Sequence, residues 1–271
     1  MRNIVVKEHV FEHIMTKEEL IRFSMFYGIC VAKDSFIVTN NNNVIIGQER
    51  LSAPLWIYIK NDLSVNERDE VIKIICERIV LNPTLNVDGE EKYLNSILNE
   101  ISIISEVSLE ISLPKNSYFC KNPIKPKVIC GYISKASDED LETLSIFSRD
   151  NWEDIGFGIL SKEQANKLAE KKLANFDFKV WRNEKDKVVA MATVHKYGKV
   201  ALIDGVFADR NERNKGYAKL LMYRITKDLL NEGIMPMLYA DRRKSVPNHL
   251  YQSIGYEYCG EITEYRLLAQ R

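Results

Sequence analysis

The sequence predicts an α+β fold in two domains, residues 1–125 and 126–271. In the second part, strand-like and helix-like stretches follow the order β-α-α-β-β-β-α-β-α-β-β, which mixes antiparallel hairpins with one parallel crossover. That order differs from the regular alternation of a Rossmann fold. The boundary is placed at Lys121–Lys127, where two prolines and three lysines can continue neither a helix nor a central strand.

The composition excludes several classes of protein. With 45% hydrophobic and 28% charged residues, the 271-residue chain is typical of a folded globular protein. The 38 basic residues balance the 38 acidic ones, so no net charge attracts nucleic acid or an anionic membrane. The longest apolar runs, such as Val188–Val194, are too short to span a membrane, and the N-terminus lacks signal-peptide features. Five scattered cysteines predict neither disulfides nor a metal site, so we expect a cytoplasmic protein.

The first part is expected to be a mixed α/β domain. Asparagines at Asn40–Asn43 tolerate left-handed backbone and predict a hairpin turn. Apolar residues recur at helical spacing in Val65–Leu81. Asp88 is predicted to cap a helix through Leu98, with Glu91 completing a capping box. The predicted strands are Ser35–Thr39, Val44–Gly47, Leu55–Ile59 and Val107–Leu113.

In the second part, helix caps and turn residues mark the ends of the predicted elements more clearly. Ser137 or Asp138 is expected to cap the helix Asp138–Arg149, and Ser161 the helix Lys162–Ala174. The predicted strands are Val128–Ile133, Asp177–Trp181, Lys187–His195, Val200–Phe207, Pro236–Ala240, Glu257–Cys259 and Thr263–Leu268. The remaining helices are Asn214–Asn231 and Pro247–Ile254.

The stretch from Val206 to Ala218 carries the clearest chemistry, because it joins an apolar strand to a long amphipathic helix through a basic loop. A helix N-terminus presents unpaired N–H groups and a partial positive charge. Gly216 would let a ligand approach the backbone closely. Further positive charge comes from Arg210, Arg213, Lys215 and Lys219. The stretch therefore predicts an anion site suited to a pyrophosphate, although it matches neither a Walker A loop nor a dinucleotide-binding glycine motif.

The pattern Arg-x-x-Gly-x-Ala at residues 213–218 resembles a signature of the GNAT superfamily of N-acetyltransferases. Downstream, residues 248–256 resemble the Asn-x-x-Tyr-x-x-x-Gly-(Phe/Tyr) element of that family. The resemblance covers about residues 127–268, and the chain has Arg210 where the family usually has proline. It implies a mixed sheet flanked by helices, with acetyl-CoA as the acyl-donor co-substrate and no metal.

The resemblance also implies roles for single residues. Backbone groups of Val206, Phe207 and Ala208 are expected to pair with the pantetheine arm of the cofactor. Asn248 matches an asparagine that contacts this arm, and Tyr251 matches a cofactor-contacting tyrosine assigned as the general acid for the CoA thiolate. The loop residues expected at the pyrophosphate are Arg213, Asn214, Lys215, Gly216, Tyr217 and Ala218.

The general base is less well defined by the sequence. Asp204 is the first candidate, because it lies two residues before Val206 on the strand that leads into the motif. Glu264 and His195 are the alternatives.

The first part resembles the N-terminal half of the glycine N-acyltransferase-like branch, in which that half looks like a degenerate copy of the same fold. It has no Arg-x-x-Gly-x-Ala loop. We therefore expect it to hold no second CoA and to wall the acceptor cleft.

Two functions are left open by the sequence. The first is an acetyl-CoA-dependent N-acetyltransferase that acts, as a monomer or homodimer, on a primary amine of a small molecule, amino acid or peptide. The second is a non-catalytic CoA-binding sensor or interaction module. The presence of both Asn248 and Tyr251 favours the enzyme, whereas the fold alone would not, because one fold supports many functions.

Overall fold

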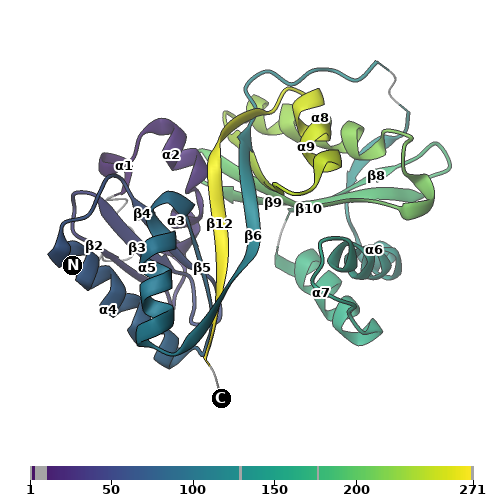
Figure 1. Cartoon of the computed structure of the whole chain (residues 1–271). Coiled ribbons are helices and arrows are strands. Elements are labelled where there is room, and N and C mark those ends of the chain that lie inside the picture. The colour runs from purple at the N-terminus through teal and green to yellow at the C-terminus, as the bar shows by residue number, and fades with distance from the viewer. Residues whose placement is uncertain (1, 4–10, 128–129, 176, 270–271) are drawn as a thin grey trace. The chain divides into compact units, whose positions relative to one another are not determined.

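The structure, a computed structural model, describes residues 2–3, 11–127, 130–175 and 177–269. The chain forms two compact units (Figure 1). Unit 1 comprises Met1–Tyr118, Tyr239–Ser245 and Tyr258–Arg271, and unit 2 comprises Phe119–Leu238 and Val246–Glu257. The separation into domains at residue 125 stays a prediction.

Unit 1 contains a mixed sheet in the order β1-β2-β3-β4-β5-β12-β6. Strands β4 and β5 pair in parallel, while β1 with β2, β2 with β3, β3 with β4 and β5 with β12 are antiparallel. The bounds are β1 (Arg2–Asn3), β2 (Phe36–Thr39), β3 (Val44–Gln48), β4 (Leu55–Ile59), β5 (Thr84–Gly89), β6 (Val107–Phe119) and β12 (Glu257–Ala269).

Helices cover both faces of the unit 1 sheet. Because side chains alternate along a strand, Ile46 packs into the core with α4 and α5, whereas Ile45 packs into the core with α1 to α3. Both residues are fully buried. The helices are α1 (Phe11–Ile14), α2 (Lys17–Arg22), α3 (Met25–Val31), α4 (Val65–Leu81) and α5 (Glu91–Ile104).

Unit 2 contains strands in the order β11-β10-β9-β8-β7, in which only the described pair β10 and β11 is parallel. The strands are β7 (Tyr132–Lys135), β8 (Asp177–Arg182), β9 (Val188–Tyr197), β10 (Val200–Ala208) and β11 (Met235–Asp241). The helices are α6 (Leu141–Asp154), α7 (Lys162–Asn175), α8 (Tyr217–Asn231) and α9 (Ser245–Ser253). Short 3₁₀ turns, η1 (Asp138–Asp140) and η2 (Arg210–Glu212), precede α6 and α8.

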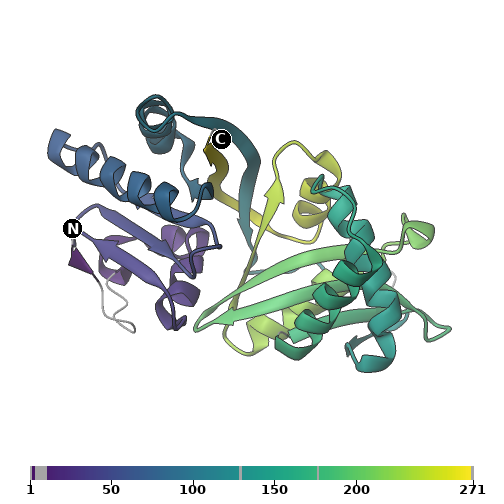
Figure 2. The same ribbon diagram turned by 90° about the horizontal axis from the view of Figure 1, so that it is seen from below.

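Helices also flank the unit 2 sheet. Figure 1 shows α6 and α7 on one side of β8 to β10 and α8 on the other, and Figure 2 shows α6 and α7 lying across these strands. On the α6 side, Phe147 packs against the sheet, and its ring centroid lies 5.2 Å from that of Phe207 in β10. These mixed sheets with flanking helices confirm the predicted α+β class.

The two units repeat one order of elements. In each, a first strand and its helices lead into antiparallel strands, and a helix joins the two strands of the parallel pair. That connecting helix is α4 between β4 and β5 in unit 1, and α8 between β10 and β11 in unit 2.

Several predicted elements are confirmed with the same bounds or nearly so, among them the hairpin at residues 36–48, α4 and α7. The prediction for Asp88 was wrong, because this residue lies in β5 and α5 begins at Glu91 without a side-chain cap. The two strands predicted at residues 257–268 form the single strand β12, and α8 begins at Tyr217 and not at residue 214. Residues 128–129 of the predicted strand Val128–Ile133 lie outside the described residues.

Among the residues that the structure describes, no helix has the length and apolar character needed to cross a bilayer.

Candidate active site

The end of β10 departs from regular strand geometry. Its parallel pairs with β11 run from Val200 to Leu202, and the register with β9 shifts between Asp204 and Phe207. Gly205 lies within this bulge with φ +59°, a left-handed conformation that favours glycine. The described parallel pairing therefore stops well before β10 ends at Ala208.

The N-terminus of α8 is shaped to leave its backbone N–H groups accessible. Gly216 is the N-cap, with φ +83° and no side-chain cap hydrogen bond. A Cβ built at Gly216 would meet no atom within 4 Å, so there is open space next to the helix end. Asn214 is also left-handed, with φ 65°, which helps to turn the loop into the helix. Uncapped N–H groups together with the helix dipole make this end attractive to an anion.

The corresponding helix of unit 1 is capped by its own side chains. At the start of α4, Ser64 Oγ accepts a hydrogen bond from the backbone N–H of Glu67, and the Glu67 carboxylate accepts one from the N–H of Ser64 at 2.9 Å. The positive end of α4 therefore already carries a carboxylate. Nearby, a Cβ at Gly89 would lie only 2.6 Å from the carbonyl oxygen of Ile57, so β4 and β5 are packed closely where their pairing ends.

A basic hollow of about 440 Å³ adjoins the start of α8. Lys215, Gly216 and Lys219 line it from the loop and the helix, and Lys125 and Lys127 line it from the preceding segment. Lys215 also pairs with Glu212 at 2.7 Å. The hollow thus combines the open helix end with several ammonium groups.

The two arginines of the loop are held by acidic side chains. Arg210 pairs with Glu153 at 2.9 Å and with Asp154 at 2.7 Å, and Arg213 also pairs with Asp154. The Arg213 guanidinium also lies over the Phe207 ring, 5.4 Å from its centroid. The arginine side chains of the loop are thus engaged in ion pairs, whereas the start of α8 has no side-chain cap.

A cluster of titratable groups lies at the bulge of β10. His195 Nε2 lies 3.2 Å from Asp204 Oδ2, and about half of the Asp204 side chain is exposed (49%). Burial alone would raise the pKa of Asp204, but the hydrogen bond from His195 and the charges of His195 and Lys172 lower it overall. Asp204 is therefore ionised at neutral pH.

Tyr251, in α9, lies close enough to sense the charge of Asp204. Burial raises the pKa of the Tyr251 phenol, and the Asp204 carboxylate raises it further. Only 7% of this residue is exposed. The phenol therefore keeps its proton at neutral pH, as a proton donor must.

In unit 2, His195 Nε2 thus lies 3.2 Å from Asp204 Oδ2, and Tyr251 lies within range of the Asp204 charge. Asn248 lies one helical turn before Tyr251 in α9. Glu264, an alternative base, belongs to unit 1, where its carboxylate accepts hydrogen bonds from Asn86, Ser112 and Lys115.

Sequence reasoning missed Lys172 of α7. A Cβ built at Gly205 would lie 2.9 Å from its Nζ, so the lysine reaches the bulge. No local pattern distinguishes it from the neighbouring lysines of that helix.

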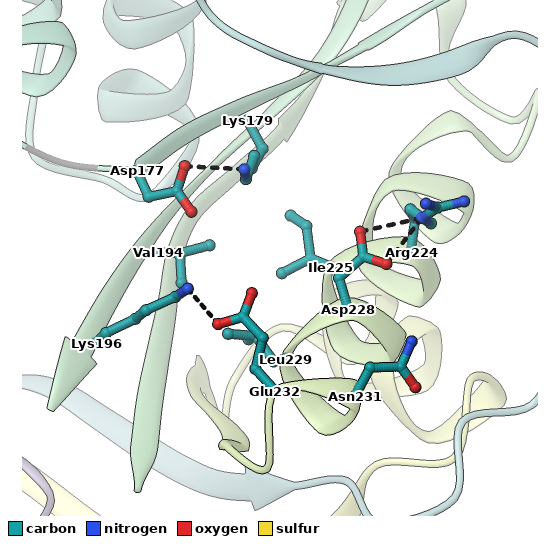
Figure 3. Close-up of a pocket in the computed structure, with 10 residues that line it drawn as sticks. All are labelled: Asp177, Lys179, Val194, Lys196, Arg224, Ile225, Asp228, Leu229, Asn231 and Glu232. Atoms are coloured by element: carbon teal, nitrogen blue, oxygen red, sulfur yellow. Dashed lines mark hydrogen bonds and ion pairs between the residues drawn. The ribbon is translucent and has the colours of Figure 1, made fainter. Parts of the chain in front are cut away.

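A second hollow of about 350 Å³ lies on the α8 face of the unit 2 sheet, between β8, β9 and α8 (Figure 3). Lys196 lines it, whereas the adjacent His195 belongs to the cluster at the bulge. Its charges are paired with one another: Asp177 with Lys179, Lys196 with Glu232, and Arg224 with Asp228 (Figure 3). This hollow offers no comparable set of reactive groups.

Residues 141–256 match the model of the acetyltransferase (GNAT) family. A GCN5-related N-acetyltransferase from Kribbella flavida has a similar structure, with a TM-score of 0.64, 15% identity, and coverage of 93% of this chain and 96% of that one. A GCN5-related N-acetyltransferase from Sphaerobacter thermophilus gives a TM-score of 0.58 at 11% identity, covering 93% and 85%. At these identities the likeness shows the fold alone. No curated protein matches the sequence.

Proposed function

We propose that this protein is an acetyl-CoA-dependent N-acetyltransferase, because residues 141–256 match the model of the acetyltransferase (GNAT) family. It transfers an acetyl group to a primary amine of a small molecule, amino acid or peptide. The observation that carries the proposal is the uncapped start of α8 after the bulged strand β10, with Asp204 on that strand and His195 Nε2 3.2 Å from its carboxylate.

The residues of unit 2 fit the parts of acetyl-CoA. The N–H groups at Gly216, Tyr217 and Ala218 open α8 and suit the pyrophosphate, and the basic hollow beside them suits further phosphate charge. The end of β10, past its described pairs with β11, suits the amide groups of the pantetheine arm. The capped N-terminus of α4 does not offer such a place, so we assign the cofactor to unit 2 only.

The chain's own groups then supply proton transfer. Acetyl-CoA contributes an activated thioester. The ionised Asp204, whose Oδ2 lies 3.2 Å from His195 Nε2, accepts the proton of the acceptor ammonium directly or through water. The Tyr251 phenol, which keeps its proton, donates it to the departing sulfur. Much of the remaining rate enhancement comes from holding the amine against the thioester.

We expect Gly216→Asp to weaken acetyl-CoA binding roughly ten- to a hundredfold, the range expected when a charge-assisted contact is replaced by repulsion. The new carboxylate would stand at the α8 N-terminus, where the phosphates are expected, and φ +83° strains any residue with a side chain. Titration calorimetry measures the effect. Binding should also weaken with added salt, which screens exposed charges.

Gly198→Asp is the matched control, because Gly198 is also left-handed, with φ +60°, and a Cβ there would meet no atom within 4 Å. It lies in the turn between β9 and β10. Equal affinity of both variants for acetyl-CoA would reject the α8 site. Normal binding of acetyl-CoA without thiol release over a broad panel of amines would instead identify a non-catalytic module.

A further inference from the structure

The last turn of α6 lies against the loop that joins β10 to α8, and its acidic side chains hold the two arginines of that loop. Arg210 pairs with Glu153 at 2.9 Å and with Asp154 at 2.7 Å. It also donates a hydrogen bond to the backbone carbonyl of Asp150 at 3.2 Å. Arg213 pairs with Asp154 as well. The two arginines therefore share the Asp154 carboxylate.

Asp154 acts on these arginines as an internal anion. Burial alone would raise the pKa of Asp154, but the hydrogen bonds from Arg210 and Arg213 lower it overall. The carboxylate is therefore ionised at neutral pH. The positive charge of Arg213, three residues before the open N-cap Gly216, is thus already compensated before a phosphate group arrives.

The pair between Arg213 and Asp154 can be exchanged, because solvent reaches both partners. The exposed fraction is 45% for the Arg213 side chain and 31% for the Asp154 side chain. Ion pairs with this exposure contribute little to stability, whereas a phosphate group can accept two parallel hydrogen bonds from a guanidinium. The Arg213 guanidinium also lies over the Phe207 ring, 5.4 Å from its centroid, so it keeps a contact with the end of β10 when the carboxylate leaves.

Arg210 gives the displaced carboxylate a partner to stay with. It contacts Asp154 independently of Arg213, and its further contacts with Glu153 and the backbone of α6 hold its guanidinium in place. Arg210 stands where the family that the sequence resembles usually has proline, which could make none of these side-chain contacts. The arrangement therefore depends on a residue at which this chain departs from the family pattern.

Resting on the proposed function, we propose that Asp154 is an autoinhibitory counter-ion, which occupies Arg213 in the free protein and which the diphosphate of acetyl-CoA displaces. The ligand gains Arg213 only when the pair between Arg213 and Asp154 breaks, and Asp154 then stays paired with Arg210. Asp154 therefore lowers the affinity for acetyl-CoA and raises the concentration at which the site fills.

Asp154→Asn tests this inference, because it removes the charge and keeps the size of the side chain. We expect titration calorimetry at low ionic strength to give a dissociation constant for acetyl-CoA about three- to tenfold below that of the wild type, the range for losing one or two exposed ion pairs. In an Arg213→Met background the same change should gain less than about twofold, because no pair is left to exchange. An equal gain in the two backgrounds would overturn the proposal, because Asp154 would then act by repulsion at a distance.

Asp228→Asn is the matched control. Asp228 forms an exposed pair with Arg224 at 3.0 Å in α8, so this variant loses the same charge without touching the loop. Its affinity for acetyl-CoA should match that of the wild type within about twofold, because exposed distant charges are screened. An equal gain in Asp228→Asn would show that net charge alone is responsible, and an affinity of Asp154→Asn equal to or below that of the wild type would show that Asp154 only orients Arg213. Either result would overturn the proposal.

Inorganic pyrophosphate, titrated into the same proteins, separates this inference from the proposed function. If none of the proteins binds acetyl-CoA but Asp154→Asn binds pyrophosphate more tightly than the wild type, the proposed function fails and the exchange at Arg213 stands. If Asp154→Asn binds neither ligand, both fail. If acetyl-CoA binds equally to the wild type and to Asp154→Asn, only the exchange at Arg213 fails.

Discussion

Replacing Tyr251 with phenylalanine is expected to lower kcat by about 10²–10⁴-fold, the usual contribution of a general acid, with acetyl-CoA affinity nearly unchanged. Only the hydroxyl is removed, and the buried ring can keep its place, with its centroid 6.0 Å from that of Tyr256. Because burial and Asp204 raise the pKa of Tyr251, the phenol is protonated across the neutral range. The loss should therefore persist without a new pH dependence between pH 6 and 8.

The measurement is thiol release under saturating acetyl-CoA, together with calorimetry for binding. Tyr256→Phe is the matched control, because the Tyr256 hydroxyl lies 2.7 Å from that of Thr226 and both are buried. That change should cost about 1 kcal/mol of folding free energy and leave kcat nearly unaltered. A Tyr251→Phe enzyme with full kcat would remove the general-acid role, and a change confined to KM would indicate a binding role for the hydroxyl.

The elements around the proposed cofactor loop could be predicted because their signals are local. The loop at residues 213–218 carries its glycine and its basic residues within one turn of the helix that it opens, and Ser161 signals the start of α7 within three residues. The same is true of the hairpin at Asn40–Asn43, whose Asn40 side chain accepts hydrogen bonds from the backbone of the turn.

Asp88 shows why other parts could not be predicted. The run Asp88-Gly89-Glu90-Glu91 has the composition of a helix start, and local chemistry alone favours a cap. In the structure Asp88 is 1% exposed within β5, and its partner is Lys115, 27 residues away. The pairing of strands that are distant in sequence overrides the local preference.

The proposed catalytic residues show the same limit. Asp204 could be proposed from the sequence because it lies two residues before Val206, where the motif begins. Lys172 could not, because it lies in a lysine-rich helix in which only packing distinguishes one lysine from the next. Glu264 was a reasonable candidate by residue type, but its carboxylate is engaged by Asn86, Ser112 and Lys115 in unit 1.

Lys115→Met is expected to destabilise the protein by about 3–5 kcal/mol, because it leaves buried carboxylates without their counter-ion. Lys115 Nζ lies 2.6 Å from Asp88 Oδ1 and 3.3 Å from Glu264 Oε2, and none of the three residues is more than 8% exposed. The ammonium also lies 5.4 Å from the Trp56 ring centroid. Urea unfolding at pH 7 measures the change.

Arg266→Met is the control, since Arg266 pairs with Glu110 at 3.1 Å on an exposed surface of the same unit, where a pair contributes about 0–1 kcal/mol. The combination of Lys115→Met with Asp88→Asn and Glu264→Gln should recover much of the lost stability, because no buried charge is left unpaired. Equal losses of unfolding free energy in Lys115→Met and Arg266→Met would contradict the inference that the buried carboxylates need the Lys115 ammonium as their counter-ion.

The loss in Lys115→Met should also shrink in acid. Burial raises the pKa of Asp88 from 3.8 to about 6 in the folded protein, although Lys115 opposes the shift. A raised carboxyl pKa means that the folded state binds a proton more tightly than the unfolded chain, so this stabilisation is present below pH 4 and is lost as the pH rises through about 6. Removing Lys115 raises the pKa of Asp88 further, so the variant should be closer to wild type at pH 5 than at pH 8. A destabilisation that is constant between these pH values would show that lost packing, and not the unpaired carboxylates, weakens the variant.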